Sequence, residues 1–390
     1  MKIWIKISSI TLVLFILLLV GLIYIFDIGV SWPSSSITFA PGQPVAMTDT
    51  TEYGIKPRNI IIFIADGMGF SHLSLAMLTH QSENTTPVWR QFDVRSWHDA
   101  RCTYGPLTDS GASGTAMASG TPTYFDVIGQ DKDGNRVASV FELATAQNYA
   151  TGIVTDSYIW DATPAAFVAH TKSRDNAKEI LMQLAQSNLD LLFGELEDIG
   201  EGEVPDLQTT LQIIDQRFYR LNKDLSYQDK GVAGKPLAAI YAEDEVQDMD
   251  SSPNLLQLTD FALNHLESLE KPFILLVESE EMDAASHKND SDRIVKGLES
   301  IQKTLELVLD YSKKDGETLV LFTSDHETGG MAAVADYDNY PNMKIRWATL
   351  NHTAAVVPLL AKGPGAKQFS SLHRNWEIGV VLKGLIVNEK

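Results

Sequence analysis

The sequence predicts an α/β protein, a three-layer α/β/α sandwich around a central, mostly parallel sheet, preceded by one N-terminal transmembrane helix. Short continuous apolar runs typical of buried strands recur along the 390 residues, and amphipathic helical stretches separate them. A long uncharged apolar run precedes all of them. Hydrophobic residues make up 44% of the chain and charged residues 21%, so the composition is that of a globular protein with a substantial core.

Residues 1–27 form the predicted membrane segment. Lys2 and Lys6 precede an uncharged run over residues 7–26, close to the ~20 residues that a helix needs to cross a bilayer. Lysines before the run and Asp27 after it place the N-terminus in the cytoplasm, so the catalytic part is expected outside it, in the periplasm or extracellular space. A cleaved signal peptide, giving a secreted form, is the alternative. No good cleavage site directly follows the run, which favours an uncleaved anchor.

Residues 28–56 are expected to be an extended linker, because the chain is rich in Ser, Pro, Thr and Gly from Ser31 onward. No internal repeat and no second break in composition follow. Residues 57–390 are therefore expected to form one domain. Within it, the acidic segment from Gly194 to Pro205 is predicted to be a surface loop.

Strands and helices are predicted to alternate in this domain, as in a parallel sheet with helices on both faces. The predicted strands are Ile60–Ala65, Thr151–Thr155, Phe273–Val277 and Leu319–Thr323. The predicted helices are Ser139–Asn148, Asp175–Ser187, Leu255–Ser268 and Asp292–Lys313.

Acidic or imidazole groups follow three of the predicted strands. Asp66 follows the first, Glu278 the third, and Asp325 with His326 the fourth. Ligands bind at the carboxyl ends of strands in open α/β sheets, so these groups are expected at one edge. Carboxylates gathered there repel each other unless cations lie among them. The pattern therefore predicts a site for several metal ions.

The charge balance and the cysteine count restrict partners and metals. A formal net charge of −20 disfavours nucleic acid and anionic lipid as partners, and it repels a phosphate substrate at long range. Phosphate chemistry would then need local cations. Cys102 is the only cysteine, which excludes an intramolecular disulfide and a Cys-rich zinc motif. His, Asp, Glu and hydroxyl ligands remain, and they suit zinc and magnesium.

Ser110 begins a run of very small residues (Ser110 to Ala116, SGASGTA) that follows Thr108 and Asp109. One interpretation is a serine N-cap on a tightly packed helix. The other is functional, because a helix N-terminus stabilises an anion and so favours both serine ionisation and a bound phosphate. No histidine lies beside Ser110 in the sequence, so a metal would have to activate it.

Four further segments carry candidate ligands. Asp283 and His287 are four residues apart and would share one face of a helical turn, as a zinc pair can. Asp325 and His326 precede paired glycines at a strand end, whereas His352 stands alone and could be structural. Asp161 and Thr163 offer oxygen ligands, and Arg174 offers a planar fork that matches phosphate.

Taken together, these segments resemble the alkaline phosphatase family. The matching blocks are DGMG, TDSGASGTAMASG, DATPAAFVAH followed by Arg174, VESEEMDAASH, TSDHETGG and NHTAAVVPLLAKGPG, from about residue 59 to the C-terminus. The resemblance implies a phosphomonoester hydrolase with two Zn²⁺ and one Mg²⁺ per chain, acting on small phosphate monoesters through a phosphoserine intermediate. The family is usually dimeric, which implies a homodimer as a further expectation.

The resemblance also implies a role for each candidate. It places the first zinc on Asp283, His287 and His352, and the second on Asp66, Asp325 and His326. It places the magnesium on Asp66, Thr163 and Glu278, with Asp161 steering its water. Ser110 would be the nucleophile, and Arg174, positioned by Asp109, would clamp the phosphoryl group.

Ala284 departs from the family pattern, because some members carry a basic or imidazole group there that helps to hold phosphate. Phosphate affinity and the identity of the third metal therefore stay open. A sulfatase is disfavoured because Ser110 lacks a Ser-x-Pro-x-Arg setting, and a diesterase because Arg174 is present. An anchored ectodomain that binds metals without turnover is the rival from another class, and the filled ligand positions disfavour it.

Overall fold

The computed structural model describes residues 15–18, 55–79, 87–196, 207–227, 234–247, 250–334 and 342–387. Most of the expected anchor and linker therefore lies outside the described residues, apart from a helical turn at 15–18 and residues 55–56. Among the residues that are described, no helix is both long enough and apolar enough to cross a membrane.

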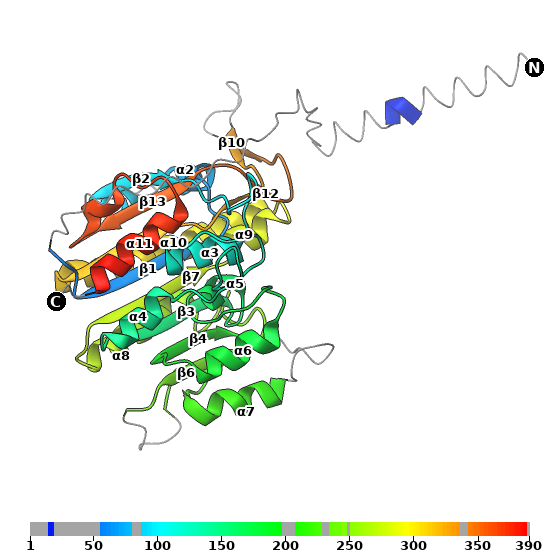
Figure 1. Cartoon of the computed structure of the whole chain (residues 1–390). Helices are drawn as coiled ribbons and strands as arrows, with labels where there is room; N and C mark the ends of the chain where they lie inside the picture. The colour runs from blue at the N-terminus through cyan, green and yellow to red at the C-terminus, as the bar shows by residue number, and fades with distance from the viewer. Residues whose placement is uncertain are drawn as a thin grey trace, which may run out of the picture.

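A nine-stranded sheet forms the centre of the molecule, in the order β2-β13-β8-β1-β7-β3-β4-β6-β5 (Figure 1). The strands are β1 Asn59–Ala65, β2 Val94–His98, β3 Ala150–Tyr158, β4 Leu191–Glu195, β5 Tyr219–Arg220, β6 Leu237–Tyr241, β7 Phe273–Ser279, β8 Thr318–Thr323 and β13 Val357–Lys362. All pairings are parallel except those of β13, which runs antiparallel to both β8 and β2. The expected mostly parallel sheet is confirmed.

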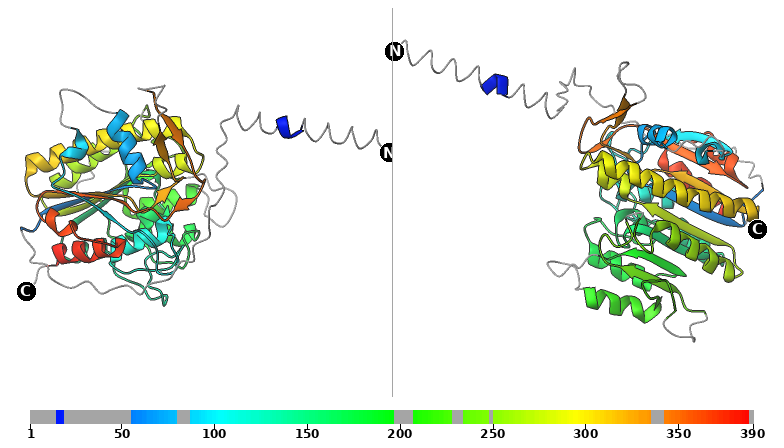
Figure 2. Two further views of the ribbon diagram at one scale, coloured as in Figure 1. Left: turned by 90° about the horizontal axis from the view of Figure 1, so that it is seen from above. Right: turned by 180° about the vertical axis from the view of Figure 1, so that it is seen from behind.

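Helices cover both faces of the sheet, as Figure 2 shows from above and behind. Alternate residues of β1 enter two separate cores: Ile60, Ile62 and Ile64 on one face, Ile61 and Phe63 on the other. The first core contains side chains of α3 Ser110–Ser119, α4 Val140–Ala146, α5 Ala162–Ala166, α6 Ala177–Gln186, α7 Leu207–Arg217 and α11 Asn375–Ile386. The second contains side chains of α2 Phe70–Thr79, α8 Leu255–Ser268, α9 Glu281–Ser286 and α10 Ser291–Asp315. This is the expected three-layer sandwich.

Short elements complete the fold. The short strands β9 Glu327–Thr328, β10 Ala332–Val334, β11 Lys344–Arg346 and β12 His352–Thr353 lie between β8 and β13 in the chain. The 3₁₀ helices are η1 Val88–Arg90, before β2, and η2 Ala366–Phe369, after β13. β9 pairs with β12, with His352 opposite Thr328. This pairing brings the segments after β8 and before β13 together, which the sequence did not predict.

The predicted strands and helices agree with the structure to within a few residues, but the start of the acidic loop is wrong. Gly194 and Glu195 belong to β4 and are buried. A Cβ on Gly194 would lie 2.6 Å from Cγ2 of Thr155, so close packing between β4 and β3 explains the glycine. Residues 197–206 lie outside the described residues.

Candidate metal and phosphate site

The candidate residues gather at the carboxyl edge of three neighbouring central strands. Asp66 follows β1, and Asp325 follows β8 by one residue. Glu278 is still part of β7, where it pairs with Ile64 of β1, rather than following the strand as expected. These parallel strands end at one edge, so the three carboxylates meet there, all less than 5% exposed.

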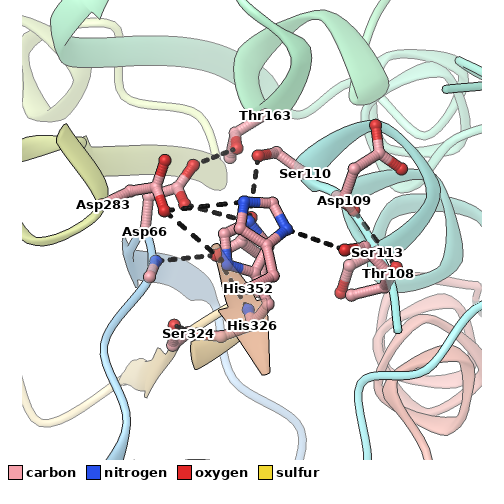
Figure 3. A network of polar contacts seen from close by, with 12 residues as sticks. Asp66, Thr108, Asp109, Ser110, Ser113, Thr163, Asp283, Ser324, His326 and His352 are labelled. Carbon is pink, nitrogen blue, oxygen red and sulfur yellow. Dashed lines mark hydrogen bonds and ion pairs between the residues drawn. The ribbon is translucent and has the colours of Figure 1, made fainter. Parts of the chain in front are cut away.

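Ser110 is the first residue of α3, and Asp109, not Ser110, is the N-cap. The carboxylate of Asp109 accepts hydrogen bonds from the backbone N–H groups of Gly111 (3.3 Å) and Ala112 (3.1 Å). This arrangement satisfies the helix terminus and leaves the Ser110 hydroxyl free to face the site. Its Oγ lies 3.3 Å from Nε2 of His326 (Figure 3). It also lies 3.4 Å from Nη1 of Arg174.

Three imidazoles face the centre of the site with the same ring nitrogen. Nδ1 of His352 donates to the carbonyl of Thr108 (2.8 Å), and Nδ1 of His287 donates to the carbonyl of Leu350 (2.6 Å). Nδ1 of His326 lies 3.2 Å from the hydroxyl of Thr328, whose own proton goes to Asp283. Each Nδ1 therefore carries the proton, and each Nε2 offers a lone pair, which is the arrangement that metal-ligating histidines require.

Asp66, Asp325 and His326 form a buried cluster, called the inner group below. Nε2 of His326 lies 3.4 Å from Oδ1 of Asp66 and 3.2 Å from Oδ2 of Asp325. Neither of these two carboxylate oxygens has a hydrogen-bond partner among the described residues, and no residue of the group is more than 4% exposed. Buried, unpaired carboxylate oxygens around a lone pair fit a cation.

Asp283, His287 and His352 form a second cluster, called the outer group below. Asp283 and His287 lie on one face of α9 and its C-cap, as their spacing predicts, with 3.2 Å between Oδ2 and Nε2. Nε2 of His352 lies 3.2 Å from Nε2 of His287 and 3.7 Å from Oδ1 of Asp283. Their ligand atoms all lie within 4.8 Å of one another, which suits a single ion. His287 is exposed at the rim.

The two groups touch each other. The His326 and His352 rings stack with centroids 3.6 Å apart, and Oδ1 of Asp283 lies 3.9 Å from Nδ1 of His326 (Figure 3). Ligand atoms of Asp66, Asp283 and His326 also fall within 4.8 Å of one another. The geometry could accommodate two adjacent cations, with Ser110 beside the inner group.

Thr163 and Glu278 adjoin the far side of Asp66. The hydroxyl of Thr163 donates to Oδ2 of Asp66 (3.2 Å), and the hydroxyl of Thr155 donates to Oε2 of Glu278 (2.5 Å). The all-oxygen donor set of Asp66, Thr163 and Glu278 suits a hard cation such as magnesium. Thr155 is an additional member that the sequence did not indicate.

Asp161 contacts Arg174. Its Oδ1 lies 2.9 Å from Nη2 of Arg174 and also accepts from the N–H of Ala162, so Asp161 caps α5 as well. Nη1 of Arg174 lies 3.4 Å from Oδ2 of Asp109. Burial disfavours the charged guanidinium, but the carboxylates of Asp161, Asp109 and Asp66 outweigh it and hold the pKa of Arg174 above its ordinary range. Arg174 is thus a fixed cation beside Ser110.

Burial and mutual repulsion dominate the electrostatics of the acids. Burial, and then the charges of Asp325, Asp283 and Glu278, raise the pKa of Asp66 well above its ordinary value. Burial and the charge of Asp161 likewise raise the pKa of Glu278. Burial also works against ionisation of Asp283, yet its contact with Nε2 of His287, which is a hydrogen bond when that imidazole is protonated, and the neighbouring His326 outweigh burial and lower the pKa of Asp283. Cations would relieve the acids of the inner group.

Several supporting residues were missed or were taken as ordinary. Thr155 and Thr328, which hold Glu278 and Asp283, gave no signal, because threonine in or near a strand is common. His170, interpreted as structural, binds the carbonyl of Gly129 through Nδ1 (2.7 Å) away from the site. His72, interpreted as ordinary, is buried and links Gly69 to Ser286 of α9.

The fold and the site define an α/β protein with adjacent cation positions, a serine at a helix N-terminus and a phosphate-matching arginine. The sequence profile of the alkaline phosphatase family matches residues 57–204 and 238–344. The chain belongs to this family.

Two curated relatives and one solved structure illustrate the similarity. "Alkaline phosphatase 4" of Bacillus subtilis is 31% identical over 308 residues, covering 72% of this chain and 63% of its own length. The alkaline phosphatase of Escherichia coli is 27% identical over 367 residues, covering 78% of this chain and 77% of its own length. The structure of the alkaline phosphatase from the Antarctic bacterium TAB5 superposes with a TM-score of 0.77 at 28% identity, covering 86% of this chain and 100% of that one.

The matched region spans 63% of the length of each of two Bacillus subtilis relatives. A variant of the TAB5 enzyme is described with Mg bound in its M3 site. Family membership implies metal cofactors for this chain, and the donor sets described above are consistent with that.

Proposed function

We propose that this chain is a metal-dependent phosphomonoester hydrolase that acts through a phosphoserine intermediate at Ser110. The observation that carries the proposal is the position of the Ser110 hydroxyl. It lies at the N-terminus of α3, 3.4 Å from the Arg174 guanidinium and 3.3 Å from Nε2 of His326 in the inner group. A nucleophile, an anion-stabilising helix terminus and a phosphate clamp thus meet at one point.

Zinc is proposed for the inner and outer groups, and magnesium for Asp66, Thr163 and Glu278. The unpaired buried oxygens Oδ1 of Asp66 and Oδ2 of Asp325 support a cation in the inner group. The mixed His and Asp donors of both groups suit zinc, whereas the third set is all oxygen. When bound, such ions supply positive charge for the serine alkoxide, the phosphoryl oxygens and the leaving oxygen.

The chain's own residues would orient the reaction. Oγ of Ser110 gives its proton to solvent and bonds to phosphorus as the P–O bond of the ester breaks in line with it, and the departing ester oxygen takes up a proton from solvent. Arg174 holds the phosphoryl oxygens, and Asp161 and Asp109 hold Arg174 in turn. Attack of water on the phosphoserine from the leaving side then releases phosphate and restores the hydroxyl. The residues mainly supply position and charge, as a loose transition state needs.

The proposed substrates are small phosphate monoesters, because the Arg174 guanidinium, 3.4 Å from Oγ of Ser110, is a planar cation that matches the free oxygens of a terminal phosphoryl group. Hydrolysis of p-nitrophenyl phosphate, bis-p-nitrophenyl phosphate and p-nitrophenyl sulfate, with and without chelator, tests this. We expect monoester turnover that is lost on chelation and returns with zinc plus magnesium. A preference for diester or sulfate, or no turnover by folded, metal-loaded protein, would overturn the proposal.

Membrane attachment through residues 1–27, with the catalytic domain in the periplasm or outside the cell, is proposed from the sequence alone. A homodimer is proposed from the family. Removal of residues 1–30 is expected to give a soluble, active protein, and light scattering would then measure its mass. Loss of folding on truncation would contradict a separate anchor.

A further inference from the structure

Asp126 adopts an unusual backbone conformation next to the phosphate clamp. Its φ is +76°, in the left-handed region where a side chain is disfavoured and glycine is the common occupant. It lies in the loop between α3 and α4, and it is half-buried. A disfavoured conformation that persists beside a reactive centre is grounds to ask what the side chain does there.

Asp126 contacts Asp109, one support of Arg174, and also the segment that carries Arg174. Its backbone N–H donates to Oδ1 of Asp109 (3.0 Å), and its carbonyl accepts from the backbone N–H of Arg174 (2.8 Å). Its carboxylate accepts a hydrogen bond from the hydroxyl of Ser173 (2.8 Å), the residue directly before Arg174. One residue thus links the N-cap of the Ser110 helix to the segment that carries the arginine.

The residues after Asp126 continue this link. The hydroxyl of Thr115 on α3 donates to the carbonyl of Val127 (3.2 Å) and accepts from the N–H of Gly129 (2.8 Å). On the other side, Ile128 and Thr171 exchange two backbone hydrogen bonds of 3.0 and 2.9 Å. The strip 126–129 therefore lies between α3 and segment 171–174, so it sets the separation between Ser110 and Arg174.

A glycine at position 126 could make both backbone hydrogen bonds in the same conformation, which is not disfavoured for glycine. The carboxylate, and with it the bond to Ser173, is what a glycine would lack. We propose that Asp126 is a positioning residue: its carboxylate fixes Ser173 and thereby the Arg174 guanidinium, which sets the affinity for the phosphoryl group. The inference rests on the proposed function, because it assigns the same arginine to phosphate.

Three single variants and one double variant test this assignment. In D126G we expect KM for p-nitrophenyl phosphate and Ki for inorganic phosphate to rise together about fivefold, as for the loss of one modest hydrogen bond, with kcat within about twofold. D126N keeps an acceptor oxygen and tolerates the left-handed region, so it should restore most of the affinity. S173A should reproduce D126G, and the D126G/S173A double variant should be no weaker than either single variant.

N148G is the matched control, because Asn148 also has a positive φ (+63°) but lies in an exposed turn after α4. It should leave KM and Ki unchanged. Unchanged KM and Ki in D126G, equal changes in N148G, or a fall in kcat at constant Ki would each overturn the inference.

Failure of the proposed function can be distinguished from failure of this inference, because the proposed function fails if the wild-type protein does not hydrolyse the monoester. In that case, protection of the metal-loaded protein by inorganic phosphate against thermal unfolding still compares D126G with wild type. Weaker protection in D126G supports the role of Asp126 in holding phosphate, and equal protection contradicts it.

Discussion

The inner and outer groups lie in contact, yet they differ in how far the protein alone satisfies them. In the inner group, Asp66, Asp325 and His326 are all at most 4% exposed, and two carboxylate oxygens have no hydrogen-bond partner among the described residues. In the outer group, the side chain of His287 is 39% exposed, and Asp283 accepts from Thr328 and lies 3.2 Å from Nε2 of His287.

The difference concerns what each group needs in order to be stable. The inner group concentrates negative charge that the fold does not neutralise, so a cation there would stabilise the folded state as well as serve the chemistry. The outer group has its own hydrogen bonds and access to solvent, so it can persist without a cation and exchange it more readily. The predictions below test this contrast, from the largest expected effect on activity to the smallest.

D325N should have the largest effect, and it should separate activity from stability. Loss of one inner carboxylate is expected to lower kcat/KM by about 10³-fold or more, because charge stabilisation at the nucleophile is lost. Chelator-treated D325N should nevertheless unfold at a higher temperature than chelator-treated wild type, because repulsion between Asp325 and Asp66 is relieved. D310N, which removes an exposed charge on α10, controls for net charge. A metal-free D325N that is less stable than wild type would contradict the charge argument.

H287N should have a smaller effect that excess metal reverses. The imidazole is a proposed direct ligand at the exposed rim, so its loss is expected to lower zinc affinity by about 100-fold or more, beyond the effect of losing a residue that only supports a ligand. Activity at limiting zinc should fall by that factor and largely return at high zinc, as a zinc titration would show. H373N, at an exposed histidine outside the site, is the control. Loss of activity that zinc cannot restore would show that His287 is as essential as the residues of the inner group, and would contradict the contrast between the two groups.

T155V should weaken only the proposed magnesium position. The substitution removes the 2.5 Å hydrogen bond from Thr155 to Glu278. Because this bond lowers the pKa of Glu278, its loss raises that pKa and makes the carboxyl harder to ionise. We expect the magnesium concentration for half-maximal activation to rise about three- to tenfold. T304V is the control, because Thr304 is a buried threonine on α10 whose hydroxyl donates to the carbonyl of Ser300 in the same helix. An unchanged magnesium dependence would show that Thr155 does not contribute to the proposed magnesium position.

D156N should change stability without changing activity. Burial, and to a smaller extent the charges of Glu281 and Glu195, raise the pKa of Asp156 to about 7 from the ordinary 3.8. Between these values the folded state holds a proton that the unfolded state has lost, so this contribution to stability falls as pH rises from about 4 to about 7. The free energy of unfolding of D156N should therefore exceed that of wild type by about 1–3 kcal/mol at pH 8, and the two should be equal near pH 4. Chemical denaturation at both pH values measures this, and an equal shift at both would contradict the assignment.

The sequence predicted the site residues that lie just after a strand or share one helical turn. Asp66 and Asp325 come straight after apolar runs, so a parallel sheet had to bring them to one edge. The spacing of Asp283 and His287 placed both on one helical face. The family resemblance then supplied His352, which its own surroundings in the sequence did not distinguish from a structural histidine.

What the sequence did not indicate depends on tertiary contacts. Backbone carbonyls of Thr108 and Leu350 orient two imidazoles, and backbone atoms carry no sequence signal for such a role. The β9–β12 pair that joins the His326 and His352 segments is only two residues long on each side. Asp109 took the N-cap position that Ser110 could have held, because it can also reach Arg174 and Asp126.

The central claim is that Ser110 carries the phosphoryl group, and trapping it is the most direct measurement. Metal-loaded wild-type protein would be incubated with a phosphate monoester, quenched in acid, digested and analysed by mass spectrometry, beside S110A and S113A. We predict a phosphate on Ser110 in wild type and in S113A, whose altered serine lies one turn along α3 against Asn375, and none in S110A. Phosphate on another residue, or monoester turnover that persists in S110A, would contradict the phosphoserine mechanism.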